Sequence, residues 1–305
     1  MQTLPPGVFW PKDHFVQSDD GATIAYTFLG AEHGQVVALC SGFLCPDTWW
    51  FHLAPALGRA GYRVLVFHYR GIATSTLPPD TSPSSFTVDR FAADLRAIVE
   101  HEDLDDLILI GHSMGVQVML EAYRMLRART SAVVALTGPY ASPVRTLYGR
   151  RELTYVYEVV RFLLGKALPA PLLRAGWRAS WRHAPFLGIG RAVKAFGPRT
   201  SDAIVQSYVD HAAAMDPQLV LRIAEGMHEH DAMHLLADVD VPALVVVGGK
   251  DPFSPPALGI NMVATMPDAV MKTVANGTHG TILEYPEQVN GYVLDFLRDL
   301  AEIAA

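Results

Sequence analysis

The chain has 305 residues, of which 50% are hydrophobic and 18% are charged. This composition supports a substantial buried core and excludes global disorder. The formal net charge of −7 argues against a nucleic-acid partner, because nucleic acids select basic surfaces.

Several signals bear on membranes and compartment. The first residues contain no continuous apolar stretch of the kind found in signal peptides, and no run reaches the roughly 18 apolar residues of a transmembrane segment. The two cysteines, Cys40 and Cys45, are too few and too close together for a secreted disulfide framework. We therefore expect a cytoplasmic protein without a transmembrane segment, and the oligomeric state stays open.

The first predicted elements form a β-hairpin. One strand contains Val16, Asp19-Asp20-Gly21 makes the turn, and Ala22–Leu29 forms the second strand. Short, continuous apolar runs follow, and such runs are typical of parallel strands that are covered on both faces. These runs are Val36–Cys40, Arg63–Phe67, Leu107–Ile110, Val133–Leu136 and Ala243–Val247, with a last strand expected at Val270–Val274.

Helical periodicity lies between these runs. Apolar residues recur at helical spacing from Val88 to Val99, from Met114 to Leu126 and from Val289 to Leu300. The alternation of strands and helices predicts an α/β protein with a mostly parallel, doubly wound sheet.

The alternation stops between residues 140 and 234. This stretch contains helical patterns, among them Leu153–Leu164 and Asp202–Met215, and no clear strand. We interpret residues 140–234 as a helical insertion in a core domain formed by residues 1–139 and 235–305. Residues 141–200 hold 11 Lys and Arg against two Glu, a local formal charge of +9.

The strongest chemical signal is the motif Gly111-His112-Ser113-Met114-Gly115, between a predicted strand and a predicted helix. A tight strand–turn–helix connection with small residues on both sides exposes the hydroxyl of Ser113 at the end of the sheet. The alternative is an ordinary glycine-rich turn. The placement favours a nucleophile elbow formed by Gly111, His112 and Gly115 around Ser113, with His112 serving in packing.

A serine hydroxyl needs a base and an oriented imidazole. His279 lies in a glycine-flanked loop after the last expected strand, and Asp251 directly follows the run Ala243–Val247. Each alone could be a solvated loop residue. Their order, Ser…Asp…His, matches the order that this sheet topology sets for a catalytic triad, so we predict Ser113, His279 and Asp251 as nucleophile, base and acid. Glu284 is the alternative acid.

Two backbone N–H groups are needed to bind the oxyanion of a tetrahedral intermediate. Met114 follows the nucleophile and supplies one of them. Phe43, after Ser41-Gly42 at the end of a predicted strand, supplies the other. We therefore predict an oxyanion hole formed by Phe43 and Met114.

Several segments resemble the α/β-hydrolase superfamily, in its esterase- and lipase-like branch with a helical cap. Ser41-Gly42-Phe43 resembles the family's oxyanion segment, and residues 69–75 resemble its Asp-x-Arg-Gly-x-Gly-x-Ser loop. Residues 236–251 resemble the lead-in to the acid, and residues 279–286 resemble the segment of the catalytic histidine. The resemblance implies the α/β-hydrolase fold, with residues 140–234 as the cap.

The chain departs from the family pattern at three positions. Ser41 replaces a common His, His68 a common Asp, and Ala73 a common Gly. None of these changes removes a catalytic group, but they bear on the shape of the pocket floor.

We therefore expect a serine hydrolase that cleaves a small-molecule carboxylic ester with an apolar acyl group and uses no cofactor. Hydrolysis of a lactone, a thioester or a carbon–carbon bond on the same triad is the alternative. A second alternative is a ligand-binding scaffold that has lost turnover.

Two further features invite functional readings. His228, His230 and His234 lie close to Glu229 and Asp231, but their spacing matches no metal-ligand signature, so we predict no metal. The basic residues of the insertion form either a solvated face or a weak contact for anionic lipid or an anionic ester. They are Arg150, Arg151, Arg174, Arg178 and Arg182.

Overall fold

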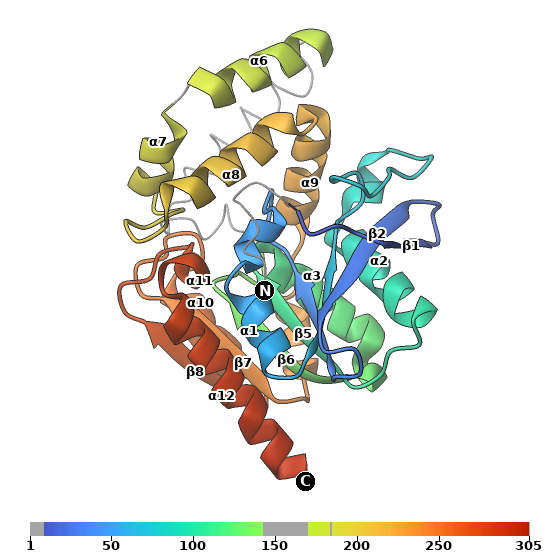
Figure 1. The fold of residues 1–305 in the computed structure, drawn as a ribbon, viewed down its shortest axis with the longest axis vertical. Coiled ribbons are helices and arrows are strands. Elements are labelled where there is room, and N and C mark those ends of the chain that lie inside the picture. The colour runs from blue at the N-terminus through green and yellow to red at the C-terminus, as the bar shows by residue number, and fades with distance from the viewer. Residues whose placement is uncertain (1–8, 143–169, 184, 305) are drawn as a thin grey trace.

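The computed structural model describes residues 9–142, 170–183 and 185–304. Within these residues the chain forms an eight-stranded sheet with the strand order β1-β2-β4-β3-β5-β6-β7-β8 (Figure 1). The strands are β1 His14–Gln17, β2 Thr23–Gly30, β3 Val36–Cys40, β4 Arg63–Phe67, β5 Leu107–His112, β6 Thr130–Leu136, β7 Ala243–Gly248 and β8 Ala269–Val274.

The sheet is mostly parallel. The predicted hairpin is present as β1 and β2, which pair antiparallel with Val16 opposite Ile24, and β2 is also antiparallel to β4. From β4 to β8 all neighbouring strands are parallel. The predicted mostly parallel, doubly wound sheet is therefore confirmed.

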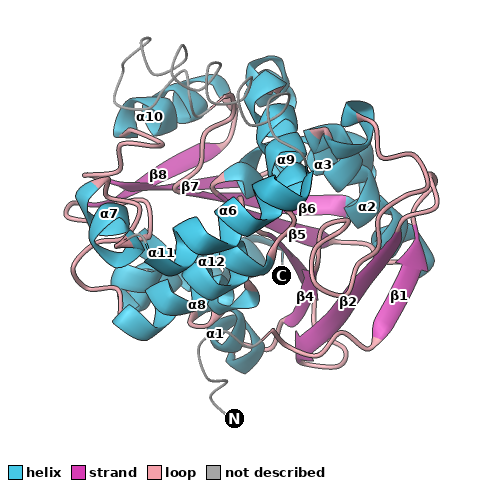
Figure 2. Ribbon diagram, turned by 90° about the horizontal axis from the view of Figure 1, so that it is seen from above, coloured by secondary structure: helices cyan, strands magenta, loops and turns pink. Residues whose placement is uncertain are grey.

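Helices cover both faces of the sheet (Figure 2). Alternate residues of a strand point to opposite faces, so Val37 and Leu39 of β3 pack with one helical layer and Ala38 with the other. Both faces are buried, which explains the continuous apolar runs. One layer contains α1 Leu53–Arg59 and α12 Pro286–Ala304, and the other contains α2 Val88–His101, α3 Met114–Leu126 and α10 Pro256–Thr265.

The described residues between β6 and β7 form helices and one isolated bridge, between Ala141 and Asp231. The helices are α6 Ala170–His183, α7 Phe186–Ala192, α8 Asp202–Ala214 and α9 Pro217–Glu229. They lie at one end of the sheet, above its loops (Figure 1). α8 confirms the helix predicted at Asp202–Met215, whereas Leu153–Leu164 falls outside the described residues. The division into core and cap domains stays a prediction.

β7 and β8 are each one residue longer than the apolar runs indicate, and β5 and β6 are longer by two and three residues. β5 continues through Gly111 and His112, which pair with Ala135 and Leu136 of β6, and β6 begins at Thr130. The predicted runs stopped at glycine and polar residues. In the structure, pairing with the neighbouring strand keeps those residues in the extended conformation. Among the described helices, none combines the length and the hydrophobicity that crossing a bilayer requires.

Candidate active site

Ser113 lies between β5 and α3 in a rarely occupied backbone conformation, with φ 55° and ψ −124°. The turn is possible because two glycines remove steric clashes on its sides. A Cβ atom at Gly111 would lie 2.4 Å from the carbonyl oxygen of Gly115, and one at Gly115 would lie 1.9 Å from that of Cys40. The backbone therefore requires glycine at both positions and presents Ser113 at the carboxyl end of the sheet.

The side chains of Ser113, His279 and Asp251 form a hydrogen-bonded chain. His279 Nε2 lies 2.8 Å from Ser113 Oγ, and His279 Nδ1 lies 2.9 Å from Asp251 Oδ2. The three residues come from loops after β5, β8 and β7, which are brought together because parallel strands end at the same edge. The Asp251 side chain is fully buried, and that of His279 is 12% exposed.

Asp251 is held as a carboxylate by its neighbours. Burial alone would raise the pKa of its carboxyl, but the adjacent imidazole of His279 and hydrogen bonds from Ser254 bring this pKa below its ordinary value. Asp251 accepts hydrogen bonds from the Phe253 N–H at 2.8 Å and from the Ser254 hydroxyl at 2.5 Å. The carboxylate is thereby fixed in place toward His279.

The loop after β3 lies against the same serine. A Cβ atom at Gly42 would lie 3.0 Å from the Cβ of Ser113, so Phe43, the next residue, is close to the elbow. Met114 is the first residue of α3. The predicted oxyanion donors, Phe43 and Met114, thus belong to two segments that meet at Ser113. Their role as donors stays a prediction.

His112, which precedes the nucleophile, packs inside the candidate site. It is fully buried, its Nε2 accepts a hydrogen bond from the Trp49 indole at 3.1 Å, and its ring centroid lies 5.3 Å from that of His279. Burial, together with the nearby His279, lowers the pKa of His112 to about 3. His112 is therefore neutral, and its ring packs near that of His279. Its packing role in the elbow stays a prediction.

Two further polar residues lie near the His279 loop. Glu284, the alternative acid, is buried and accepts hydrogen bonds from the Thr278 and Gly197 N–H groups, whereas Asp251 is the carboxylate at His279. Thr137 was not among the predicted residues, yet its hydroxyl donates to the carbonyl oxygen of His279 at 3.2 Å. Its position directly after β6, at the carboxyl edge, is the signal that could have identified it.

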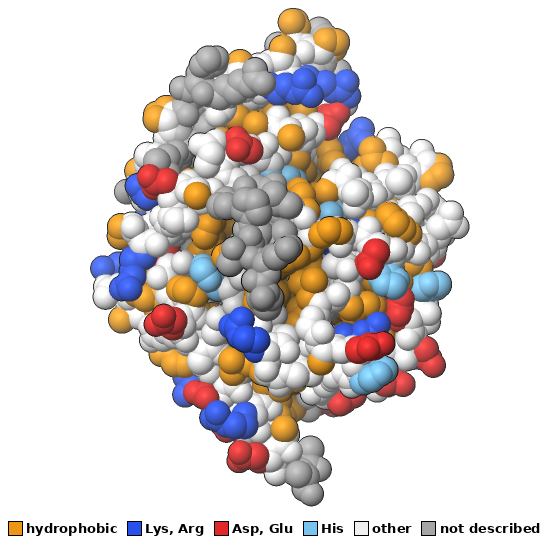
Figure 3. Space-filling view, in the orientation of Figure 1, with side chains coloured by type: hydrophobic (Ala, Val, Ile, Leu, Met, Phe, Trp, Pro, Cys, Tyr) orange, Lys and Arg blue, Asp and Glu red, His pale blue; other side chains and the backbone are white. Residues whose placement is uncertain are grey.

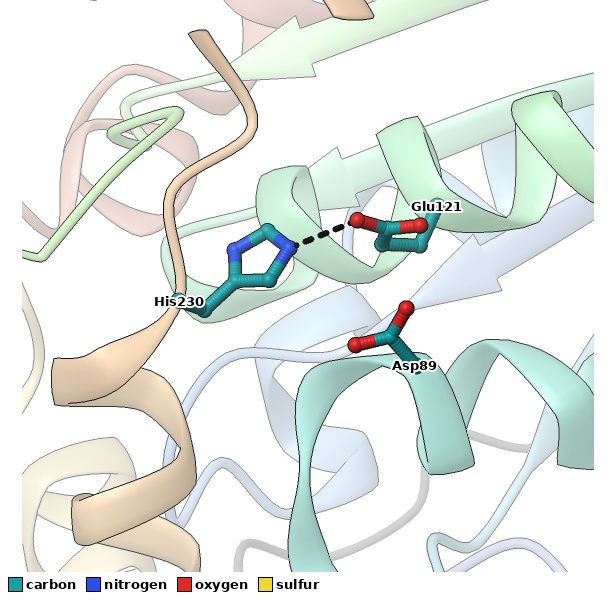
Figure 4. A group of neighbouring side chains, drawn as sticks. All are labelled: Asp89, Glu121 and His230. Carbon is teal, nitrogen blue, oxygen red and sulfur yellow. Dashed lines mark hydrogen bonds and ion pairs between the residues drawn. The ribbon is translucent and has the colours of Figure 1, made fainter. Parts of the chain in front are cut away.

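The segment 228–234 does not gather its own histidines. His228 contacts the Ser142 hydroxyl at 2.7 Å, whereas His230 Nε2 lies 2.9 Å from Glu121 Oε1 (Figure 4). One possible metal-ligand atom from each of His230, Glu121 and Asp89 lies within 4.8 Å of the other two. Arg124 contacts both carboxylates, at 2.7 Å and 3.3 Å. The guanidinium supplies the positive charge here, and the group forms an ion-pair network between α2, α3 and the end of α9.

The basic residues of the insertion are partly neutralised. Arg174 pairs with Asp216 at 2.6 Å, while Arg178 is exposed. Figure 3 shows a patch of basic side chains beside α6, whose described basic residues are Arg174 and Arg178. Arg150 and Arg151 lie outside the described residues, and the side chain of Arg182 is also outside them.

Comparisons with known proteins extend this picture. Residues 35–286 match the sequence profile of the alpha/beta hydrolase fold family. A non-heme haloperoxidase of Rhodococcus erythropolis is 26% identical over 297 residues, 93% of this chain and 98% of that protein. An N-formylmaleamate deformylase of Pseudomonas putida is 24% identical over 246 residues, 81% of this chain and 82% of that protein.

Among solved structures, an esterase from Exiguobacterium antarcticum has a TM-score of 0.73 and 18% sequence identity. The match covers 93% of this chain and 98% of that chain. At this level of identity the likeness is one of fold. The names of these proteins describe different reactions, so the reaction has to be argued from the site.

Proposed function

Because the chain belongs to the alpha/beta hydrolase family, we propose that it is a serine hydrolase that cleaves carboxylic esters, with Ser113 as the nucleophile. Family membership confirms the superfamily and the fold that the sequence motifs predict. The proposal adds the reaction, the roles of the residues and the substrate class.

In the first half-reaction, Ser113 Oγ attacks the ester carbonyl carbon while His279 Nε2 takes the hydroxyl proton. Asp251 fixes the imidazole tautomer and stabilises the imidazolium. The Phe43 and Met114 N–H groups donate to the oxyanion of the tetrahedral intermediate. When the intermediate collapses, His279 returns the proton to the departing alcohol, and the acyl group stays on Ser113.

In the second half-reaction, water replaces the alcohol. His279 takes a proton from the water as its oxygen attacks the acyl carbon. When the new tetrahedral intermediate collapses, the bond from the acyl carbon to Ser113 Oγ breaks, His279 returns the proton to Ser113 Oγ, and the carboxylic acid leaves. The neutral His112 beneath His279 does not compete for this proton, because burial keeps its pKa far below neutrality.

The observation that carries the proposal is the continuous hydrogen-bonded chain from Ser113 through His279 to Asp251, with distances of 2.8 Å and 2.9 Å. A serine that serves only a packing role has no need of a strained backbone, a base within hydrogen-bond distance and a buried carboxylate behind that base. A protein that only binds a ligand has no need of them either.

An apolar substrate is favoured by the surroundings of the oxyanion loop. Phe43 and Leu44 pack with apolar and aromatic side chains of the helical insertion, and such linings are typical of pockets for apolar ligands. The insertion residues in this cluster are Trp177, Trp181, Tyr208, Ala212, Met215 and Val220.

A fluorophosphonate label and a set of chromogenic esters of graded acyl length test the proposal. We expect rapid stoichiometric labelling at Ser113, detected by peptide mass spectrometry, and turnover of apolar acyl esters. Lactones and thioesters run in parallel identify the preferred bond. A folded protein that neither labels nor turns over any of these substrates would instead be the ligand-binding scaffold.

A further inference from the structure

Glu284 is a buried carboxylate that the proposed chemistry does not use. It ends the short helix α11 (Thr281–Glu284), and 3% of its surface is exposed. Its Oε2 accepts a hydrogen bond from the Thr278 N–H at 3.0 Å. Its Oε1 accepts one from the Gly197 N–H at 2.5 Å and another from the Thr278 hydroxyl. One carboxylate therefore joins two segments that are far apart in the sequence.

The two segments are the loop of His279 and residues 194–197 of the helical insertion, which we call the 194–197 segment. In Figure 1, α11 lies directly below the connection between α7 and α8 that contains this segment. The backbone N–H of His279 donates to the carbonyl oxygen of Lys194 at 3.2 Å. The insertion thus contacts the candidate base through its backbone as well as through Glu284.

The backbone around His279 is held from both sides. On one side are the Lys194 carbonyl and, through Thr278, the carboxylate of Glu284. On the other side the Thr137 hydroxyl donates to the His279 carbonyl at 3.2 Å. The imidazole has to meet Ser113 and Asp251 at once, and a shift of about 1 Å in such a group is enough to cost roughly a hundredfold in rate.

We propose that Glu284 is a positioning residue for His279, and that it couples the placement of the 194–197 segment to the base. This inference rests on the proposed function, because it assigns Glu284 a role in ester turnover. Glu284 itself touches neither the substrate nor the reacting atoms. It acts through Thr278, the residue that precedes His279.

Two substitutions on different segments test this coupling. In Glu284→Gln an amide NH2 group replaces one carboxylate oxygen and faces the N–H and O–H groups that donated to it. Because the amide nitrogen cannot accept hydrogen bonds, part of the linkage is lost. Gly197→Ala leaves the carboxylate in the sequence but displaces it, since the added Cβ would lie 2.6 Å from the Glu284 carboxyl carbon. The matched controls are Glu287→Gln, on an exposed glutamate of the first turn of α12, and Gly188→Ala, where an added Cβ has no atom within 4 Å.

We expect kcat for a chromogenic ester to fall about ten- to hundredfold in both Glu284→Gln and Gly197→Ala. KM should stay within about twofold, because the pocket is unchanged and only the base is misplaced. Fluorophosphonate labelling of Ser113 should slow in the same proportion. The double variant should be no slower than the slower single variant, because both changes break one linkage. The two controls should behave as wild type.

Thermal unfolding separates positioning from loss of the fold. If Glu284→Gln does not fold, Thr278→Val removes a single hydrogen bond to the carboxylate and serves as the milder variant, with a proportionate fall in kcat expected. Folded variants with wild-type kcat, a change confined to KM, or additive losses in the double variant would each overturn the inference. A wild-type protein that neither labels nor hydrolyses esters contradicts the proposed function itself, which is a different result.

Discussion

Ser113 and Thr137 both have positive φ angles, 55° and 39°, although neither is glycine. Such backbone conformations are costly, above all for a β-branched residue such as Thr137, and they persist where the surroundings fix them. Here the backbone N–H of Ser113 donates to the carbonyl oxygen of Leu136 at 3.3 Å. The backbone N–H of Thr137 donates to the carbonyl oxygen of Val246 at 2.9 Å. The strain therefore lies at the ends of β5 and β6, where the side chains of Ser113 and Thr137 both contact His279.

Replacement of Ser113 by Ala should abolish ester turnover and leave the fold intact. In the proposed mechanism the hydroxyl is the attacking group, whereas alanine preserves the Cβ that the backbone already accommodates at this φ. We expect the rate to fall by at least about a thousandfold, as it does when a triad member is lost. Ester turnover and thermal unfolding, measured together, check this. Wild-type activity in a folded Ser113→Ala variant would contradict the assignment of the nucleophile.

Asp251→Asn should cost about a thousand- to ten-thousandfold in kcat, because an asparagine amide holds the imidazole in the wrong tautomer. The loss should exceed that of Glu284→Gln, whose carboxylate contacts Thr278 and Gly197 and not the His279 ring. Both variants are measured with the same ester. If Glu284→Gln is the more damaged of the two, Glu284 is the acid and Asp251 is not.

The secondary structure was predicted best where one pattern dominates. Val36–Cys40 and Arg63–Phe67 coincide with β3 and β4, because both faces of these strands are buried and the apolar runs have sharp ends. The end of β5 was missed, since Gly111 and His112 resemble a turn while their ladder partners in β6 keep them extended. The local sequence thus determines which strands form, and the neighbouring strand determines where they end.

The candidate site was predicted from a similar regularity. Ser113, Asp251 and His279 each follow a predicted strand, and the ends of parallel strands share one edge. The hydrogen bond from Thr137 to His279 and the linkage from Glu284 to Gly197 could not be predicted. These hydrogen bonds depend on which polar groups come into contact when the chain folds. The spacing of residues in the local sequence does not indicate those contacts.

α8 contains a histidine that should make stability depend on pH. His211 packs on Phe9 at 5.0 Å, and burial, with His68 nearby, lowers its pKa to about 4. In the unfolded chain the His211 imidazole takes up a proton near pH 6.5, whereas in the folded chain it stays neutral down to about pH 4. The folded state therefore has its full stability above about pH 6.5, where the imidazole is neutral in both states. This stability is lost as the pH falls from about 6.5 toward 4, by up to about 1.4 kcal/mol per pH unit.

We therefore expect the melting temperature of the wild-type protein to fall between pH 7 and pH 5. His211→Gln should reduce this slope, because glutamine takes up no proton in the unfolded chain. His33→Gln, on an exposed histidine, is the matched control and should leave the slope unchanged. Thermal unfolding at pH 5, 6 and 7 measures all three proteins. Parallel curves for wild type and His211→Gln would show that His211 does not contribute.

Charge is distributed unevenly along the chain. Residues 141–200 carry a formal charge of +9, so the remaining residues carry −16. Arg174 pairs with Asp216, and Asp216 also caps α9 by accepting from the Gln218 N–H at 2.8 Å. Arg178, one turn further along α6, is exposed, so it is better suited to a test of the basic surface.

If this surface attracts anionic esters, kcat/KM for such an ester should fall about two- to fivefold between low and physiological salt, where the Debye length is about 8 Å. Turnover of a short neutral ester should stay flat, since it has no charge to screen. Arg178→Glu should weaken the salt dependence, whereas Arg298→Glu, on an exposed arginine of α12, should not. The same variants on anionic vesicles test a lipid contact by co-sedimentation. Equal salt effects on both esters, or no effect of Arg178→Glu, would mean that Lys and Arg form a solvated face here, with their stems covering apolar surface.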